Sequence, residues 1–237
     1  AISGTLISLV EQGKNVVSSR HMFGNTYSLL TKTLPRFGVT THLCDLTNLD
    51  EVRRAVDADT CCIFLEIITN PQLEVADLTA LAEIAHAHNI PLVADTTAIP
   101  FTEFSAHEQG VDIEVVSTTK YLSGGATSLG GMVIDYGGFP EFARRLHDEM
   151  LFNLGAYMTP HAASFWCLAS SASFCFSRFW ILCSSIQKQK PVTAVGIPRR
   201  TTSAPMLISI IVSPHKSRRA AGRGPPCCWA YSSTSSK

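Results

Sequence analysis

Short apolar runs alternate with amphipathic segments over the first 140 residues of the chain. The amphipathic periodicity predicts helices through residues 26–34, 48–57 and 77–89, with Asn48 as the N-cap of the second helix. The third helix would carry an apolar face made of Leu78, Leu81, Ala82 and Ala85. The apolar runs predict strands over residues 14–19, 39–45, 60–67, 90–95, 111–117 and 131–136. Continuous apolar strands separated by helices are typical of a three-layer α/β fold, in which helices cover both faces of a mostly parallel sheet.

One connection departs from this alternation. Between the strands at 111–117 and 131–136 lie only about a dozen residues, which are rich in Gly and Ser and show no helical period. A parallel crossover normally needs a helix in such a connection. We therefore predict that the strand at 131–136 is the one antiparallel strand of the sheet, with Lys120 in the connection before it.

The overall composition narrows the class of protein. The chain has 237 residues and is 46% hydrophobic, enough to bury a sizeable core. No apolar run approaches the roughly 20 residues that span a bilayer, and the N-terminal stretch lacks the basic flank and cleavage signature of a signal peptide. The eight cysteines have no metal-type spacing, which favours free thiols in a reducing compartment. We expect a cytoplasmic protein without a metal site and without a membrane or nucleic-acid partner.

Charge divides the chain into two unequal parts. Residues 1–165 contain all 19 acidic residues and nine of the 19 basic ones, whereas residues 166–237 contain ten basic residues and no acid. The second part also reads as low complexity. We interpret residues 166–237 as an aberrant basic tail, either frameshifted near Ser164 or poorly ordered. The alternative is a genuine basic tail that binds nucleic acid or an anionic membrane.

Polar side chains follow the predicted strands where ligands collect in open α/β sheets, beyond the carboxyl ends. These are Glu66 and Asn70, then Asp95, then Ser117 to Lys120. A lysine can form a Schiff base with an aldehyde cofactor, and an aspartate can pair with a pyridinium nitrogen. Hydroxyls and a Gly-rich loop can hold a phosphate, and an aromatic ring such as Phe23 could stack on the cofactor. This inventory matches pyridoxal 5'-phosphate (PLP). The role of Glu66 stays open between a salt bridge and a cap.

Several ordered motifs carry a family resemblance: "LEIITNPQLEVADL", "IPLVADTT", "DIEVVSTTKYLSGGATSLGGMVIDYG" and "NLGAYMTPHAA". From residue 1 to about 165 the chain resembles the Cys/Met-metabolism family of PLP-dependent enzymes, and within it the O-acetylhomoserine sulfhydrylases. The resemblance implies the large domain of a fold-type I PLP transferase over residues 1–140, N-terminally incomplete. Residues 141–165 would then begin the linker helix toward a C-terminal domain.

The resemblance also implies roles for individual residues. Lys120 would hold the cofactor aldehyde and then act as the catalytic acid and base. Asp95 would keep the pyridine nitrogen protonated, and Phe23, at a position that the family often fills with Tyr, would stack on the ring. Asn70 would contact the ring hydroxyl. The phosphate ligands would be Ser117 and Thr119.

The implied function is γ-replacement in sulfur amino-acid biosynthesis. Acetate of O-acetylhomoserine would be replaced by sulfide or a thiol, giving homocysteine or methionine. The alternatives are a cystathionine synthase or lyase, and an inactive fragment or pseudoenzyme, because residues 166–237 contain no motif for the family's carboxylate-binding arginine. The implied partners are a small amino-acid substrate and, in the full-length form, further copies of the chain in a homo-oligomer.

Overall fold

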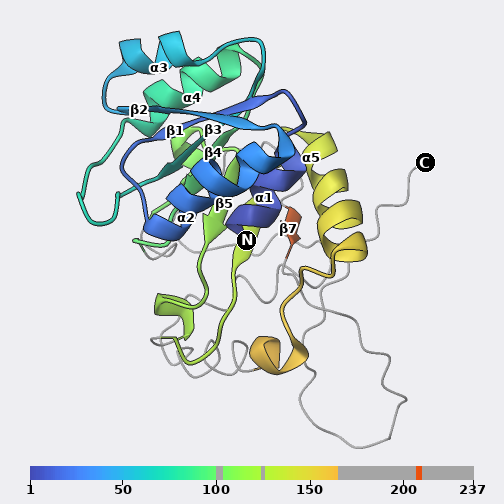
Figure 1. Ribbon diagram of the computed structural model, residues 1–237. Helices are drawn as coiled ribbons and strands as arrows, with labels where there is room; N and C mark the ends of the chain where they lie inside the picture. Colours follow the sequence, from blue (N-terminus) through green and yellow to red (C-terminus); the bar gives the residue numbers. More distant parts are fainter. Residues whose placement is uncertain (100–103, 124–125, 165–206, 210–237) are drawn as a thin grey trace, which may run out of the picture.

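The computed structural model describes residues 1–99, 104–123, 126–164 and 207–209, and its described strands form one sheet (Figure 1). The strand order is β2-β1-β3-β4-β5-β6-β7. Strands β1 to β5 are parallel to one another, and β6 is antiparallel to both β5 and β7. The bounds are β1 Asn15–Ser19, β2 Thr40–Cys44, β3 Thr60–Glu66, β4 Leu92–Asp95, β5 Ile113–Val116, β6 Met132–Asp135 and β7 Leu207–Ser209. The predicted antiparallel strand is thus confirmed.

Helices cover both faces of this sheet, as the apolar pattern predicts. On one face lie α3 (Leu49–Ala55) and α4 (Leu78–Ala87), at the top of Figure 1. On the other lie α1 (Ile2–Leu9), α2 (Gly24–Ser28) and α5 (Pro140–Arg145). Two of these helices continue as wider or tighter turns: α2 through a π-helical turn at Leu29–Thr33 and a 3₁₀ turn at Leu34–Phe37, and α5 through a π-helical segment at Leu146–Asn153. Short 3₁₀ turns also occur at His107–Gln109 and Tyr121–Ser123.

The alternation of side chains along β3 explains why a continuous apolar run is needed. Ile63 and Leu65 pack into the core beneath α3 and α4. Cys62 and Phe64 point the other way, into the core beneath α1, α2 and α5. Successive side chains of a strand face opposite sides, so a strand covered on both sides has no position for a solvated residue. Both cores therefore draw on the same central strands.

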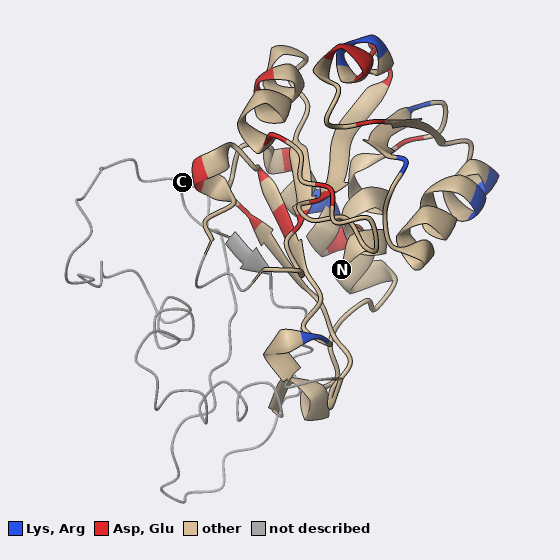
Figure 2. Ribbon diagram, turned by 90° about the vertical axis from the view of Figure 1, so that its left-hand side faces the viewer, with Lys and Arg blue, Asp and Glu red and all other residues tan. Residues whose placement is uncertain are grey.

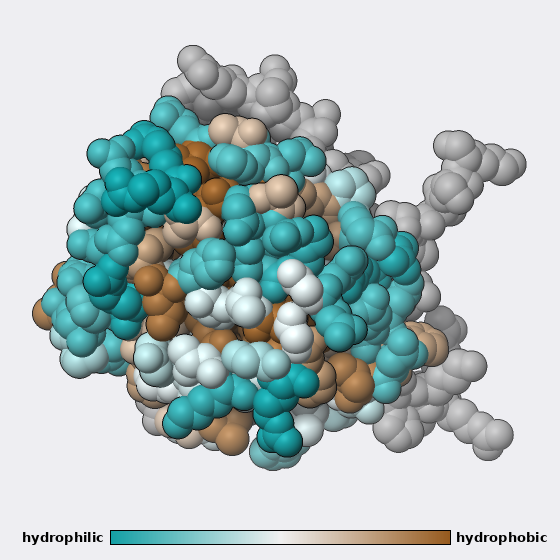
Figure 3. All heavy atoms as spheres, turned by 45° about the horizontal axis from the view of Figure 1, so that its top comes forward, coloured by the Kyte–Doolittle hydropathy of each residue, from teal (hydrophilic) through white to brown (hydrophobic). Residues whose placement is uncertain are grey.

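The two helices α3 and α4 begin at side-chain caps. The Asn48 side chain accepts a hydrogen bond from the Glu51 N–H at 3.3 Å, and Asp77 accepts one from the Ala80 N–H at 3.0 Å. These bonds satisfy amide groups that the first turn leaves without a partner. The predicted apolar face of α4 is buried, and the face over α3 and α4 that Figure 3 presents is largely hydrophilic. The predicted N-cap at Asn48 is confirmed.

The segment from 140 to 153 packs onto α1. Arg145 makes an ion pair with Glu11 at 3.0 Å and donates to the Val10 carbonyl at 3.2 Å. A Cβ on Gly4 would lie 3.6 Å from Cε of Met150, so α1 and this segment are in close contact. No helix among the described residues is long and apolar enough to cross a membrane. The interpretation of residues 166–237 lies outside the described residues, except at β7.

Candidate functional site

The carboxyl ends of three neighbouring strands bring the predicted polar residues to one edge of the sheet. Glu66 at the end of β3 pairs in register with Asp95 at the end of β4. Asp95 pairs in turn with Val115 of β5, two residues before Ser117. Ligands of open parallel sheets bind beyond this edge. The connection from β5 to β6 extends from the same edge, in the lower part of Figure 1.

Lys120 and Phe23 meet although 96 residues separate them in the sequence. Phe23 follows β1, and the Nζ atom of Lys120 lies 5.9 Å from the centroid of its ring. Both side chains are accessible: Lys120 is exposed, and Phe23 keeps 44% of its surface exposed. Stacked aromatic rings have centroids about 4.5–7 Å apart. A flat ring on Phe23 would therefore lie within reach of the lysine amine.

Asp95, at the end of β4, is a partly buried carboxylic acid. Burial raises the pKa of its carboxyl group, because a low-dielectric surrounding disfavours the charged form. Hydrogen bonds from the Thr97 hydroxyl and from its N–H, 2.9 Å from Oδ1, lower that pKa, as does the nearby amino group of Ala1. A cation placed against Asp95 would lower it further, since opposite charges favour the ionised form.

Thr97 joins the ends of β4 and β5. Besides its bonds to Asp95, its hydroxyl oxygen accepts a hydrogen bond from the Ser117 N–H at 2.8 Å. Sequence reasoning did not single out Thr97. Its only signal was a second hydroxyl two residues after the strand-end Asp95, a spacing that commonly satisfies a local backbone group.

Thr119 is engaged differently from the expectation of a hydroxyl turned toward a phosphate. Its hydroxyl donates to the Gly130 carbonyl at 3.1 Å and accepts from the Gly130 N–H at 3.0 Å. Its single O–H would have to rotate to serve a phosphate. Gly130 lies close to its neighbours, because a Cβ there would be 2.5 Å from both Met158 Cε and Thr118 Oγ1.

Asn70 and Glu66 are connected through the backbone. Asn70 is exposed, and its N–H donates to Glu66 Oε2 at 3.1 Å. Glu66 also accepts from the Phe23 N–H, at 2.8 Å from Oε1. Burial raises the pKa of Glu66, the two N–H donors lower it, and the charge of Asp95 raises it. Sequence reasoning identified Glu66 as a strand-end polar residue without a role.

Charged and metal-ligating side chains are unevenly distributed over the described residues. Figure 2 shows acidic residues on the central strands and basic residues mainly on outer helices and loops. Among the described residues, no three His, Cys, Asp or Glu side chains are grouped so that they could hold a metal ion. Burial raises the pKa of Cys44 to about 11, so its thiol stays protonated at neutral pH.

The residues present fit a phosphorylated aromatic aldehyde. Lys120 offers an amine for the aldehyde, Phe23 a face for the ring, and Asp95 a buried carboxylate for a ring cation. Ser117 lies beside the Gly-containing connection that could meet the phosphate, although its N–H is already bonded to Thr97.

A family model and several curated proteins match this chain. A family model described as Cys/Met metabolism PLP-dependent enzyme matches residues 1–169. The sulfhydrylase FUB7 of Fusarium oxysporum f. sp. lycopersici is 34% identical over 67% of this chain and 44% of its own length. A canavanine gamma-lyase of Pseudomonas canavaninivorans is 36% identical over 69% of this chain and 40% of its own length. The chain therefore spans less than half the length of these curated relatives.

Solved structures of similar enzymes also match this chain. The O-acetylhomoserine sulfhydrylase of Wolinella succinogenes matches with a TM-score of 0.66 and 39% identity, over 73% of this chain and 55% of that chain. A putative O-acetylhomoserine (thiol)-lyase of Campylobacter jejuni matches with a TM-score of 0.66 and 30% identity, over 71% of this chain and 49% of that chain. The latter structure contains N'-pyridoxyl-lysine-5'-monophosphate.

Proposed function

Because the chain belongs to the Cys/Met-metabolism family of PLP-dependent enzymes, we propose that its strand-end residues bind PLP and carry out γ-replacement on O-acetylhomoserine. The observation that carries this proposal is the position of the Lys120 amine, 5.9 Å from the centroid of the Phe23 ring. The end of β4, where Asp95 lies, is next to the strand that leads to Lys120.

Each residue has a distinct task in this proposal. Lys120 provides the amine that binds the aldehyde, and Phe23 covers one face of the ring. Asp95 holds a proton on the pyridine nitrogen, and its burial strengthens that interaction because the dielectric constant is low there. Asn70 would contact the ring hydroxyl, and Ser117 and Thr119 would contact the phosphate.

When bound, PLP supplies an electron sink that makes the α-proton of an amino acid acidic enough to remove. Lys120, released by the substrate amine, would take the proton from the α-carbon, pass it to the electron sink and, as a free amine again, take a proton from the β-carbon. The bond from the γ-carbon to acetate breaks, and acetate departs with the electron pair. Sulfide or a thiol then forms the new carbon–sulfur bond, and protons return to the β- and α-carbons. The products are homocysteine or methionine, and acetate.

A lyase is the second candidate, because a γ-lyase is among the relatives. The first steps would be shared, but water rather than a thiol would complete the reaction. A cystathionine synthase or lyase is a further alternative among PLP-dependent enzymes. A third candidate is an inactive fragment, since the chain spans under half of the curated relatives and its residues 166–237 lack a recognisable carboxylate-binding motif. In the full-length form we propose a homo-oligomer.

The experiment uses the purified full chain with added PLP. Reduction with borohydride and peptide mapping should find the pyridoxyl group on Lys120, and Lys120→Ala should lose it. Lys32→Ala is the matched control, because Lys32 is also exposed but lies outside the site. Labelling of Lys32 equal to that of Lys120 would refute a specific site.

The substrate assay separates the candidates. O-acetylhomoserine with sulfide should give homocysteine and acetate, which a sulfhydrylase forms faster than it cleaves cystathionine. Faster release of a 2-oxo acid and ammonia without added thiol would favour the lyase. A chain that binds PLP at Lys120 and turns over none of these substrates would be the inactive fragment.

A further inference from the structure

Glu66 ends the apolar strand β3 and is 92% buried, since only 8% of its surface is exposed. A charged side chain in such a place is costly unless hydrogen bonds compensate it. Its two oxygens each accept one backbone N–H: Oε1 from Phe23 at 2.8 Å and Oε2 from Asn70 at 3.1 Å. The donors lie on two different loops, one after β1 and one after β3.

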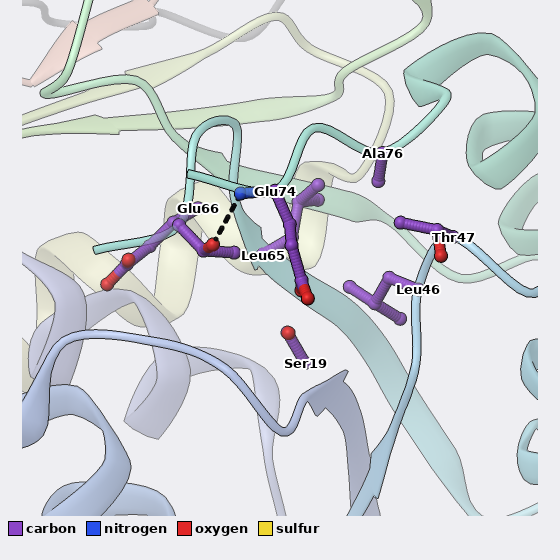
Figure 4. A pocket seen from close by; sticks show the side chains of 8 residues that line it. Ser19, Leu46, Thr47, Leu65, Glu66, Glu74 and Ala76 are labelled. Carbon is purple, nitrogen blue, oxygen red and sulfur yellow. Dashed lines mark hydrogen bonds between the residues drawn. The ribbon is translucent and has the colours of Figure 1, made fainter. Parts of the chain in front are cut away.

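A second carboxylate in the same area has a different partner. Glu74 lines the pocket of Figure 4 together with Glu66, and its carboxylate points toward Ser19. It contacts Nδ1 of His21 at 2.8 and 2.9 Å, and its own N–H donates to Thr69. The Glu66 carboxylate points away from Glu74 in this view. The two carboxylates therefore bind different partners, and of the two only Glu66 accepts hydrogen bonds from the backbone of predicted site residues.

Through two backbone hydrogen bonds, Glu66 can position the side chains of Phe23 and Asn70. Phe23 and Asn70 are both substantially exposed, so packing alone does not fix them. The strand that carries Glu66 is hydrogen-bonded on both sides, to β1 and to β4. A bond from each loop to one end of this strand fixes the two loops relative to each other, as supporting residues do for binding sites generally.

We propose that Glu66 is a positioning residue: its carboxylate holds the loops of Phe23 and Asn70 at the separation at which the ring covers one face of PLP while the amide reaches the ring hydroxyl. This inference rests on the proposed PLP site. It assigns Glu66 no contact with the cofactor.

The role requires a carboxylate because both partners are donors. Glutamine has the same shape, but one of its two terminal atoms is an NH₂ group that can only donate. In Glu66→Gln one of the two backbone N–H groups would face a donor and lose its acceptor. Glu66→Asp keeps two acceptor oxygens on a shorter side chain, so it should retain part of the effect.

The test compares Glu66→Gln and Glu66→Asp with Asp135→Asn. Asp135 is a matched control because it is also a buried strand-end carboxylate that accepts a backbone N–H, from Gly137 at 2.9 Å. It ends the antiparallel β6, pairs with Ile113 at the start of β5, and so lies at the opposite edge of the sheet.

Two measurements are made on the full chain. Hydrogen exchange without PLP should show one of the two amides, that of Phe23 or that of Asn70, exchanging about tenfold faster in Glu66→Gln, because loss of a bond to a charged acceptor costs at least that factor. The dissociation constant of PLP should rise about tenfold, and the circular dichroism induced in the cofactor should decrease. Glu66→Asp should fall between Glu66→Gln and the unaltered chain, and Asp135→Asn should match the unaltered chain in both measurements.

The outcomes separate the two proposals. If the unaltered chain forms no adduct at Lys120, the proposed function fails and this inference fails with it. If it forms the adduct and Glu66→Gln keeps the original amide exchange or the original affinity and dichroism, only the positioning role is wrong. An equal loss of PLP affinity in Asp135→Asn would also overturn it, because the effect would then be general destabilisation. If Glu66→Gln does not fold, Glu66→Asp decides the question by the same two measurements.

Discussion

Replacement of Phe23 by alanine should weaken PLP binding without weakening the fold. Phe23 presents 44% of its surface to solvent. A stacked cofactor would cover one ring face, on the order of 40 Å², which contributes roughly 1 kcal/mol at about 25 cal/mol per Å². The aromatic contact adds about 1 kcal/mol. Loss of about 2 kcal/mol corresponds to a rise of about 30-fold in the dissociation constant. The free energy of unfolding of the apoprotein should change by less than about 1 kcal/mol, because almost half of the side chain is already exposed and Phe23 belongs to none of the hydrophobic core clusters of the described residues.

The assay is a PLP titration followed by absorbance or by quenching of protein fluorescence, with urea unfolding of the apoprotein measured in parallel. Phe23→Tyr keeps the ring and should bind PLP as the unaltered chain does. Phe23→Leu keeps apolar area but removes the aromatic contact, so it should lose about fivefold. Unchanged affinity in Phe23→Ala would refute the stacking role, and so would a loss of affinity that follows a parallel loss of stability.

Three further predictions concern the site and its scaffold. Burial raises the pKa of Asp95, so the folded state holds its proton more tightly and the free energy of unfolding of the apoprotein falls as pH rises from the ordinary value of 3.8 through the raised one. Asp95→Asn should therefore raise the melting temperature of the apoprotein at neutral pH and flatten this pH dependence while weakening PLP binding; a lower melting temperature would contradict this. Leu81→Ala should cost about 2–5 kcal/mol in urea unfolding, because Leu81 is fully buried on the inner face of α4. Asn48→Ala should cost about 1 kcal/mol in the same assay through loss of the α3 cap, and no change would show the cap to be unimportant.

The fold could be predicted closely from the apolar pattern, because the buried strands are continuous apolar runs and the helices that cover them are amphipathic. Strand β3, with Ile63 and Phe64 on opposite faces, could only be a central strand with helices on both sides. The short Gly- and Ser-rich connection before β6 was equally informative, because a parallel return had no room for a helix. The turns that widen α2 and α5 left no comparable signal, since a π-helical turn uses the same residue types as an α-helix.

The site was predictable in part. The strand ends identified Asp95 and Lys120, since parallel strands align their carboxyl ends. Phe23 was proposed as the ring partner because it follows a strand end, and the family resemblance implied the same role. Its contact with Lys120 was not predicted, because no local pattern links positions that far apart. The bonds from the Phe23, Asn70 and Ser117 N–H groups to Glu66 and Thr97 were not predictable for another reason: every residue except proline carries a backbone N–H. For Glu66, the sequence signal was an acidic residue at the end of an apolar run.

The triple connection between Thr119 and Gly130 has a consequence for chemical rescue. Both backbone and side chain of Thr119 bond to Gly130, so the residue before Lys120 is anchored as part of the folded scaffold. In the proposed reaction the tethered Lys120 amine would act at a high effective molarity, and a dissolved amine could replace it only at high concentration. Methylamine added to Lys120→Ala should restore proton transfer only in part, and bulkier amines less well than small ones.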